Sequence, residues 1–589
     1  MTINQVGKKK LWAGVSLFLI LVWISRLAET DSLYSAYGLC AIGAVLSLRD
    51  NYQKDRSLRG LGLVIGLLLS ALLSLAAALA NYPIFQYVRE DVSGSTNTIL
   101  NAIAVVTTFA GGIVVFFQIF TYAFFRFPVS CEEEDKLCSG KHPARLFGAV
   151  MGSLSVIYLI YLLFVAYPGS VTSDAMWQID QTWYGNYSVH HPFWHTMCIE
   201  LFMNLGYWLF KDVNAAAATY NGAQALAAAA CFAYAVVTLH QHRLPKLWVG
   251  AVYAMFAFLP HHITYSCTMW KDVPFGLTML VLVVAMFRIM RRVGKSQILN
   301  YVMFMVGGIG SAVFRTNGWY ALVAAFLILL LFFRKRCREL LIPWLAVLVI
   351  GWVMIGPAMT WLNVSRNNFL EGLSVPMQQV ARVIVDEDCQ LTEEETEMLS
   401  RVMDLEMIPK VYWPQCCDPV KSQLRHTNQP YFEENFGDYV KLWMDLGRRY
   451  PWVYVEAWVE ETKGYWNGGY DYYIYAQYVQ ENDYGMYMVE QDNLIHTLVK
   501  AYFTITRETI FFQPFQSIGL NIWILSFLCF LNMVWGRREF LLTMPVIAVV
   551  FTLWLTTPVF SEFRYAYSIF TCLPFILPVS LCRKKDEVN

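Results

Sequence analysis

Residues 59–80 read RGLGLVIGLLLSALLSLAAALA, an apolar stretch whose only charge is its first residue. A helix that crosses the hydrocarbon core of a bilayer needs about 20 predominantly apolar residues, so this stretch is predicted to span a membrane. The rest of the chain has the same character. Apolar types make up 57% of its 589 residues and charged types only 15%, whereas soluble domains carry about 25% charged residues.

This composition excludes a soluble enzyme and a disordered chain. A nucleic-acid-binding module is also excluded, because such modules carry a basic surplus and here 44 basic residues balance 44 acidic ones. The 13 cysteines are scattered and do not indicate a disulfide framework. No cleavable signal peptide is predicted after Lys8–Lys10, since no small-residue cleavage site follows the first apolar run.

The apolar runs predict about fourteen membrane-spanning helices, and therefore an all-α polytopic membrane protein. The predicted spans are 11–27, 32–48, 59–80, 99–125, 147–167, 213–239, 246–264, 272–290, 297–314, 319–333, 341–359, 516–535, 539–558 and 563–582.

The orientation is predicted from the basic loops, which are enriched on the cytoplasmic side of membranes. A further run, 193–210, is long enough to cross, but a crossing there would place every later basic loop outside. We therefore predict that 193–210 lies flat or half-inserted on the outer surface, and that both termini are cytoplasmic. The basic segments that this topology keeps inside are 8–10, 49–59, 240–246, 288–295, 334–339, 536–539 and 583–585.

The predicted topology divides the chain into four regions. Residues 1–146 form an N-terminal four-helix membrane extension. Residues 147–359 form a membrane core, with a long outer loop at 168–212. Residues 360–512 form a small, mainly helical outer domain, and 513–589 add three helices that complete the core.

Local signals support helices in that outer domain. Ser374, followed by Val-Pro, favours an N-cap with proline in the first turn. Thr392 with Glu395 is a capping box, and Pro451 restarts a helix. Cys389, Cys416 and Cys417 in the same domain could form one disulfide, and the sequence does not say which.

Six polar motifs fall on the outer side of this topology, although none was used to orient it. They are YPGSVTSDAMWQID (167–180), HHPFWH (190–195), LPHHITYSCTMWKD (259–272), FRTNGW (314–319), SVPMQQVAR (374–382) and SEFRYAY (561–567). A charge at the centre of a spanning helix costs about 2.5–3.5 kcal/mol on insertion scales. Charges that gather at one depth are therefore candidates for a functional site.

Asp174 follows a Tyr-Pro-Gly stop, which ends the preceding span at the outer surface. One interpretation is structural, because Thr172, Ser173 and Asp174 are all good N-cap residues. The other is a general base held at the membrane surface beside Trp177.

Four of the ten histidines lie at the outer ends of the predicted spans, which we call the outer rim. They are His190, His191, His261 and His262. Together they could ligate a metal, although adjacent histidines point in different directions. The alternatives are hydrogen bonds to a substrate, for which we select His190, His191 and His262, and simple residence at the interface. No cofactor is assigned, and a divalent metal stays open.

The same rim carries four cations, which are Lys271, Arg315, Arg382 and Arg564. Their structural interpretation is snorkelling of long side chains, with local ion pairs to Asp272 and Glu562. The functional interpretation is a phosphate clamp, for which the planar guanidinium of arginine is suited. Arg315 is the strongest case, because it interrupts an apolar stretch from 298 to 333. Neighbouring polar residues of these motifs complete the predicted substrate-binding set, and they are Asp272, Asn317, Gln378, Glu562 and Tyr565.

These features resemble the C-fold glycosyltransferases, which use lipid-linked sugars and include protein O-mannosyltransferases and aminoarabinose transferases. The resemblance is to an Asp in the first outer loop, juxtamembrane helices, Arg-bearing later loops and an outer domain. More narrowly, YPGSVTSDAMWQ, HHP, KD, RTNG, PMQQVAR and EFRY are similar to a bacterial family of polytopic proteins of unknown function. The resemblance covers roughly 147–582, and the first four spans precede it.

The resemblance implies that Asp174 is the base and that Lys271, Arg315 and Arg564 hold the donor's phosphate. The chain departs from many relatives in one respect. They carry paired acidic residues in the first loop, whereas here Asp174 is followed by alanine and the next acid is Asp180.

The implied activity is an inverting glycosyl transfer from a polyprenyl-phosphate sugar on the outer face of the membrane. Asp174 would take a proton from an acceptor hydroxyl, and cations would stabilise the leaving phosphate. The implied partners are the donor lipid, the bilayer and a glycan, lipid or protein acceptor of the cell envelope, with no nucleic acid. The implied location is the plasma membrane of a bacterium.

Two other functions are considered. A lipid or oligosaccharide flippase, or another transporter, suits fourteen spans. Such carriers usually place ionisable groups near the bilayer midplane, often in repeated halves, whereas here the charges gather on one rim and no repeat is seen. A surface-glycan polymerase or ligase would act on a lipid-linked oligosaccharide instead.

Overall fold

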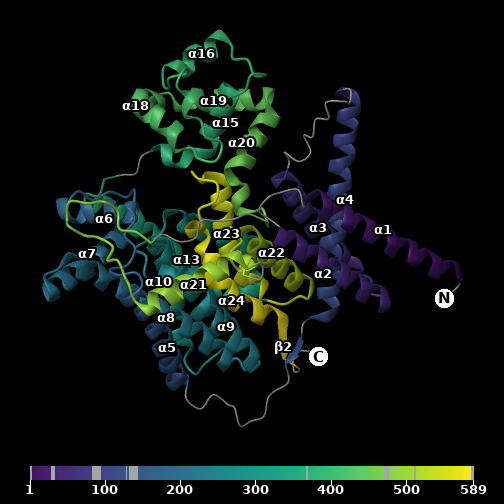
Figure 1. The fold of residues 1–589 in the computed structure, drawn as a ribbon, viewed down its shortest axis with the longest axis horizontal. Coiled ribbons are helices and arrows are strands. Elements are labelled where there is room, and N and C mark those ends of the chain that lie inside the picture. Colours follow the sequence, from purple (N-terminus) through teal and green to yellow (C-terminus); the bar gives the residue numbers. More distant parts are fainter. Residues whose placement is uncertain are drawn as a thin grey trace. The chain divides into compact units, whose positions relative to one another are not determined.

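The computed structural model of the chain is almost entirely helical (Figure 1). It describes residues 3–27, 34–81, 94–127, 129–131, 143–365, 369–469, 477–509 and 512–584. The chain forms two compact units. The membrane unit comprises Met1–Ser365, Gly468–Val549 and Phe563–Asn589, and the helical domain comprises Arg366–Asn467 and Val550–Glu562.

The membrane unit contains the elements that precede and follow the helical domain in the sequence. They are α1 (Ile3–Leu27), α2 (Tyr34–Gln53), α3 (Gly60–Ala80), α4 (Gly94–Arg126), β1 (Val129–Cys131), α5 (Pro143–Phe164), α6 (Ser173–Tyr184), α7 (Phe193–Phe210), α8 (Val213–Gln241), α9 (Lys246–Phe258), α10 (Pro260–Ser266), α11 (Asp272–Arg291), α12 (Gln297–Val313), α13 (Thr316–Ile355), α14 (Pro357–Trp361), α21 (Leu494–Glu508), η5 (Gln513–Phe515), α22 (Ile518–Val534), η6 (Phe563–Ala566), α24 (Tyr567–Leu581) and β2 (Cys582–Lys584). Helix α23 (Phe540–Thr556) begins in this unit and ends in the helical domain.

Seven helices among the described residues are long and apolar enough to cross a membrane, or eight if the bent pair α9–α10 is one span. The chain is therefore a multi-pass membrane protein. The predicted count of about fourteen is not reached by this criterion. One reason is length, since α12, α22 and α23 are apolar but have only 17 residues each.

A second reason is that two predicted spans lie within α13. Its 40 residues include a non-helical backbone at Cys337. The indole of Trp319 donates to the carbonyl of Leu348 (3.0 Å), and the indole of Trp344 donates to that of Leu322 (3.1 Å). These cross-contacts are possible only if the chain reverses near Cys337. The element is therefore a helical hairpin, and its two arms correspond to the two predicted spans.

Helix α7 does not meet the criterion for a spanning helix, although the sequence predicted that it is long enough to cross. It packs along α8 at a position where the two helices approach closely. A Cβ added to Gly206 would lie 2.8 Å from the Cα of Ala216. The small residue therefore fixes this helix pair.

Helix α11 lies at the centre of the membrane unit and is buried along nearly its whole length, between α8, α12 and α24. Its contact with α12 depends on Gly307, where an added Cβ would lie 2.8 Å from the Cα of Leu282. Because α11 is packed on so many sides, its first residues are held in a fixed position.

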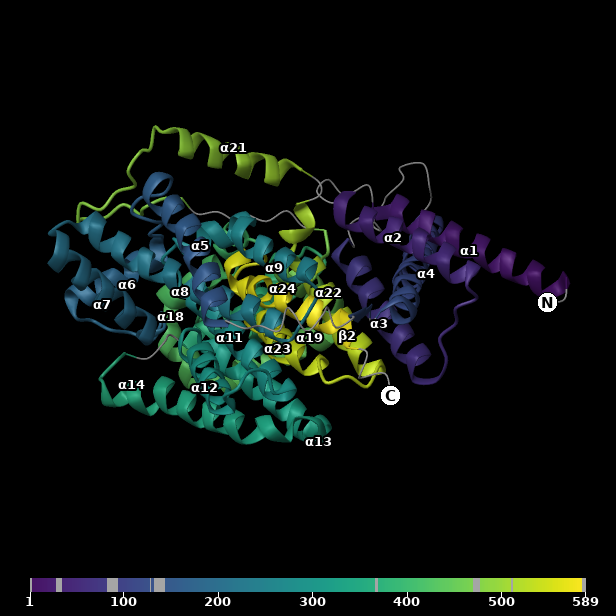
Figure 2. The same cartoon turned by 90° about the horizontal axis from the view of Figure 1, so that it is seen from below.

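The N-terminal helices α1 to α4 pack side by side, as both views show (Figures 1 and 2). The ring of Trp23 meets Tyr37 and Phe116 edge-on, with centroids 5.5 and 5.8 Å apart. Helices α3 and α4 also contact α22. A short parallel pair, β1 with β2, joins the end of this helical layer to the end of α24.

The helical domain has its own apolar core, which includes Val402, Ile408, Leu424 and Leu446. Its elements are η3 (Phe369–Leu373), α15 (Ser374–Val385), α16 (Glu393–Ser400), α17 (Ile408–Val411), α18 (Asp418–Glu434), α19 (Phe436–Arg449), α20 (Pro451–Thr462) and η4 (Lys463–Tyr465). Residues 468–512, which the sequence assigned to the outer domain, lie instead with the membrane unit where they are described.

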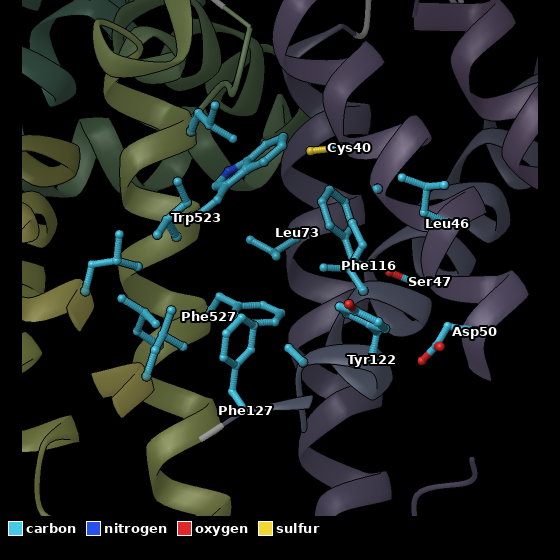
Figure 3. A pocket seen from close by; sticks show the side chains of 18 residues that line it. Cys40, Leu46, Ser47, Asp50, Leu73, Phe116, Tyr122, Phe127, Trp523 and Phe527 are labelled. Carbon is cyan, nitrogen blue, oxygen red and sulfur yellow. The ribbon is translucent and has the colours of Figure 1, made fainter. Parts of the chain in front are cut away.

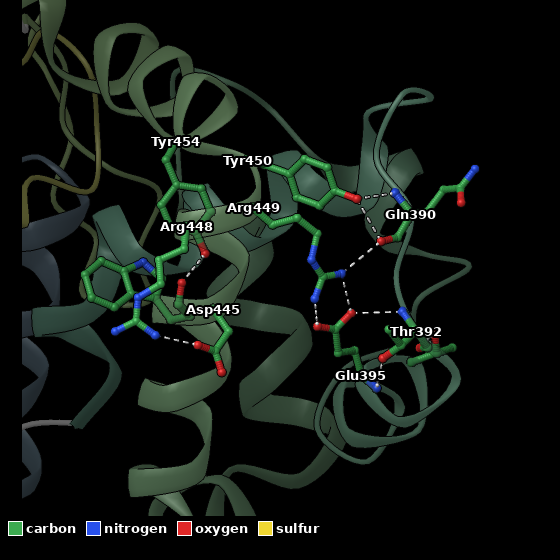
Figure 4. Close-up of polar contacts among 10 residues, drawn as sticks. Gln390, Thr392, Glu395, Asp445, Arg448, Arg449, Tyr450 and Tyr454 are labelled. Carbon is green, nitrogen blue, oxygen red and sulfur yellow. Dashed lines mark hydrogen bonds and ion pairs between the residues drawn. The ribbon is translucent and has the colours of Figure 1, made fainter.

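The capping box predicted at Thr392 and Glu395 is confirmed, with both reciprocal hydrogen bonds present. Figure 4 shows how Arg449 binds the same carboxylate from α19, while the hydroxyl of Tyr450 accepts from the backbone nitrogen of Gln390. Pro451 begins α20 as predicted. Ser374 is the first residue of α15 but makes no capping hydrogen bond, since the N-cap position is Leu373. The thiols of Cys389, Cys416 and Cys417 are all free.

Glu461 provides a test of the helical domain, because its carboxyl is fully buried in α20 and neither oxygen has a hydrogen-bond partner among the described residues. Burial raises the pKa of Glu461 to about 8; the charge of Lys421 opposes this shift and that of Asp418 adds to it. The folded state therefore keeps the proton that the unfolded chain loses near pH 4.5. We expect the free energy of unfolding to fall as pH rises from about 4.5 to about 8.

The measurement is Tm of the purified protein between pH 5 and pH 8.5. Glu461→Gln should flatten the pH dependence, because the amide does not titrate. Glu460→Gln is the matched control, since that neighbouring carboxylate pairs with Lys463 near the surface. An unchanged pH profile in Glu461→Gln would contradict the assignment.

Candidate functional site

The loop that follows α5 is fixed by contacts with α8. Gly169 has φ of +99°, and an added Cβ would lie 2.9 Å from the Cβ of Asn221. The side-chain nitrogen of Asn221 donates to the carbonyl of Pro168 (3.0 Å). Only glycine tolerates both the left-handed backbone and this close approach. The Tyr-Pro-Gly motif therefore forms a rigid turn rather than a simple helix stop.

Backbone pairing then joins this loop to the segment before α11. The nitrogen of Ser170 donates to the carbonyl of Cys267, and the nitrogen of Met269 donates to the carbonyl of Ser170, both at 2.9 Å. The amide of Gln224 on α8 donates to the carbonyl of Thr268 at 2.7 Å. The two polar motifs are therefore held at a fixed distance from each other.

Asp174 lies in the first turn of α6, and its carboxylate contacts two cations. The Oδ2 atom of Asp174 lies 2.7 Å from a terminal nitrogen of Arg564 and 3.5 Å from Nζ of Lys271. The same Nζ donates to Nδ1 of His191 at 3.0 Å. The N-cap position is Thr172, whose hydroxyl accepts from Trp270 at 2.6 Å. The carboxylate of Asp174 is therefore not the N-cap of α6. It belongs to a cluster of charged and polar side chains, which we call the Asp174 cluster and which contains Asp174, His191, Lys271 and Arg564.

The charges in this cluster perturb one another. Burial alone would raise the pKa of Asp174, but the charges of Lys271 and Arg564 hold it well below its usual range. Burial and the Lys271 charge lower the pKa of His191, so its imidazole is neutral and accepts a hydrogen bond. The side chain of Asp174 is still 27% exposed, so a ligand can reach it.

Arg315 is close to the cluster in the fold but binds other groups. It forms a buried ion pair with Asp272 (2.6 Å) and donates to the carbonyl of Tyr565 (3.1 Å). Its guanidinium also stacks on the Tyr565 ring, 4.3 Å from the centroid. The guanidinium of Arg564 lies 5.1 Å from the ring centroid of Trp270. Arg315 thus ties the first turn of α11 to the segment that carries Arg564.

The comparisons with known proteins bear on these same segments. A protein-family model matches residues 166–589, a range that contains the whole cluster. The chain belongs to the family of unknown function DUF6020. Helices α1 to α5 precede the matched range of this DUF6020 member. Neither a curated protein nor a solved structure matches the chain.

The four predicted histidines do not converge in the DUF6020 fold. His190 packs near Trp177 and against His191. His261 and His262 are fully buried in α10, where Nδ1 of His262 lies 3.1 Å from the hydroxyl of Tyr567. Among the described residues, no three His, Cys, Asp or Glu side chains are arranged to hold a metal.

His195 belongs to the HHPFWH motif but was not selected from the sequence. It is fully buried, with Nδ1 2.9 Å from the Gln178 side chain and Nε2 2.6 Å from the hydroxyl of Tyr220. These bonds join α6, α7 and α8. The third histidine of the motif therefore positions α6, the helix that carries Asp174. The sequence signal that could have indicated this role is the presence of polar residues at helical spacing near His195.

Three predicted site residues belong to the helical domain, as the sequence predicts for Gln378 and Arg382 but not for Glu562. The amide of Gln378 donates to the carbonyl of Trp413, and Arg382 pairs with Glu456 at 3.4 Å. The backbone nitrogen of Glu562 donates to the hydroxyl oxygen of Tyr465. Asn317 remains in the membrane unit, half-buried in the first turn of α13. The structure thus assembles only part of the predicted rim into one cluster.

Proposed function

We propose that this DUF6020 member is an integral membrane glycosyltransferase that uses a polyprenyl-phosphate sugar. The observation that carries the proposal is a carboxylate, Asp174, held within 3.5 Å of two cations at the ends of apolar helices. A general base and phosphate-binding cations are the two groups that this transfer requires. A donor with its tail in the bilayer presents its phosphate at the level where such helices end.

In the proposed reaction, the phosphate of the donor competes with Asp174 for Lys271 and Arg564. The carboxylate then becomes more basic, because the charges that lower its pKa turn to the ligand. It accepts the proton of an acceptor hydroxyl, whose oxygen attacks the anomeric carbon. The bond from that carbon to the phosphate oxygen breaks, and polyprenyl phosphate leaves with the negative charge that Arg564 and Lys271 stabilise.

The surface beside the cluster supports an amphipathic substrate. Trp177 lies three residues after Asp174 on α6 and is 63% exposed. Exposed aromatic rings next to charged groups are typical of sites where a ligand has an apolar and a polar part. His190 lies near Trp177, with ring centroids 6.5 Å apart, and contributes a polar group to the same surface.

The experiment is reconstitution of the purified chain in lipid with a set of synthetic polyprenyl-phosphate sugars. Release of polyprenyl phosphate, measured by mass spectrometry, is the expected result for at least one sugar. A lipidomic comparison of cells with and without the gene narrows the choice, because the true donor accumulates when the enzyme is lost. The proposal is overturned if no polyprenyl phosphate is released from any donor and no donor accumulates in cells without the gene.

The proposal also requires the cluster to face the outer side, as the basic loops predict. We expect cysteines introduced at Ser188 and Asp438, in a cysteine-free background, to react with an impermeant reagent added outside intact cells. Labelling of either position only after the membrane is opened would contradict the predicted topology.

A second candidate, a lipid transporter, is favoured by one observation. The helix pair α9–α10 is bent by 54° next to His261 and His262, and both nitrogens of His261 lack a partner among the described residues. Broken helices with buried polar groups are typical of carriers. Movement of an intact labelled donor across proteoliposomes, without bond cleavage, would favour this function.

Arg315 gives a further test of the proposed site. We expect Arg315→Lys to lower turnover at least about tenfold, because lysine loses the planar group that stacks on Tyr565 while binding Asp272. Arg315→Ala should also lower the free energy of unfolding by about 3–5 kcal/mol, since Asp272 stays buried without its partner. Steady-state kinetics and thermal unfolding measure the two effects. Near-wild-type turnover of Arg315→Lys would leave Arg315 as a structural partner of Asp272 without a role in the proposed chemistry.

A further inference from the structure

A cavity of about 610 Å³ lies in the membrane unit, away from the Asp174 cluster. Its walls come from α2, α3 and α4 on one side and from α22 and α24 on the other (Figure 3). Most of the lining is apolar and includes the labelled side chains of Leu73, Phe116, Trp523 and Phe527. Leu46, which is 60% exposed, also lines it, so the cavity reaches the protein surface.

One end of the cavity is charged. Asp50 and Ser47 line this end, with the hydroxyl-bearing ring of Tyr122 beside them (Figure 3). Asp50 pairs with Lys54 (2.9 Å) and Arg56 (2.6 Å), and the charge of Arg126 at the end of α4 also acts on it. These three cations, together with Lys9, outnumber the carboxylates of Asp50 and Asp55, of which Asp55 pairs with Lys9, so this end carries a net positive charge.

We propose that the cavity binds an acyl chain of an anionic phospholipid, whose phosphate lies against Arg56 and Lys54. The volume is in the range of about 300–1,000 Å³ that is usual for bound small molecules. An apolar wall alone does not select a lipid inside a bilayer, because lipid tails are as apolar as the wall. The charge at the end provides the selection, since basic pockets between spanning helices bind anionic head groups.

The geometry separates this lipid from the proposed sugar donor. Leu577 and Leu581, near the end of α24, line the cavity, whereas Arg564 directly precedes that helix. A helix rises about 1.5 Å per residue, so the two ends of α24 are roughly 20 Å apart. A lipid whose phosphate lies at Arg56 does not present it to Asp174. Because α2, α3 and α4 lie outside the DUF6020 match, we infer that this lipid joins the N-terminal helices to the family core.

The test uses the full chain purified in detergent, incubated with phosphatidylglycerol or phosphatidylcholine and then washed. Retained phospholipid per protein is counted by mass spectrometry. We expect retention of phosphatidylglycerol over phosphatidylcholine in the wild type. Arg56→Gln should reduce that preference about fivefold, since one cation near a lipid surface contributes about 1 kcal/mol. Ala123→Phe, which fills the cavity from α4, should lower retention of both lipids.

Arg49→Gln is the matched control, because it removes the same charge one residue from Asp50 at an exposed position and should keep the wild-type preference. Thermal unfolding of each variant shows whether it is folded. If Ala123→Phe does not fold, Arg56→Gln still tests the proposal. Equal retention of the two phospholipids, an unchanged preference in Arg56→Gln, or displacement of phosphatidylglycerol by polyprenyl phosphate would each overturn it. All of these readouts are independent of sugar transfer.

Discussion

Asp174→Asn is expected to lower sugar transfer by about 10²–10⁴-fold, the usual contribution of a positioned general base. The amide keeps the size of the side chain but cannot accept the proton of the acceptor hydroxyl. Donor binding should stay nearly intact or become tighter, because Lys271 and Arg564 lose the carboxylate that competes with the phosphate. Single-turnover kinetics and equilibrium binding of a synthetic donor measure the two effects separately.

Asp180→Asn is the control for this variant. Asp180 lies on the same helix, α6, but accepts a hydrogen bond from the hydroxyl of Tyr484 at 2.6 Å. It should therefore retain most of the transfer activity. If Asp174→Asn kept its turnover while Asp180→Asn lost it, the base would be Asp180 and the proposed role of the cluster would be wrong.

Arg564→Lys is expected to lower turnover by about 10²–10³-fold, with a smaller change in the apparent affinity for the donor. Charge on the leaving phosphate grows toward the transition state, so a lost contact affects turnover more than binding. Lysine keeps the charge but loses the planar fork and the contacts with the rings of Trp270 and Tyr565. Steady-state kinetics of the variant in lipid measure the effect.

Lys271→Arg is the matched comparison, since lysine acts as a point charge and arginine can replace it more easily. We expect this variant to keep more turnover than Arg564→Lys. The opposite order would assign the phosphate contact to Lys271 and would leave Arg564 as the partner of Asp174 alone.

Hydropathy predicted the helical membrane fold because it depends on the local run of side chains. The stretch at 59–80 is a helix over nearly its whole length. The predicted number of about fourteen spans is not confirmed, because the length and hydropathy criterion finds seven helices among the described residues and counts the hairpin α13 as one of them. The reversal at Cys337 is seen only through pairs such as Trp319 with Leu348, which are distant in the sequence.

The sequence predicted which residues belong to the candidate site better than it predicted which of them contact one another. The motifs indicated Asp174, Lys271 and Arg564 as separate charges on one rim, and the structure joins them. The pairing of Ser170 with Cys267 and Met269, which sets their distance, involves only backbone atoms and leaves no pattern in the side chains. The assignment of Glu562 to the helical domain likewise depends on long-range packing.

The bond between Asp174 and Arg564 has a consequence for the synthesis of the protein. The two residues are 390 positions apart, and a ribosome adds about 5–20 residues per second, so roughly 20–80 s separate their emergence. Lys271 emerges earlier, and until Arg564 follows, Lys271 is the cation of the cluster that can pair with the carboxylate. The cluster is completed only after Arg564, which precedes α24, has been synthesised, so a chain that stops short of this residue lacks the second cation. The contact on which the proposed chemistry depends can therefore form only long after Asp174 itself has been synthesised.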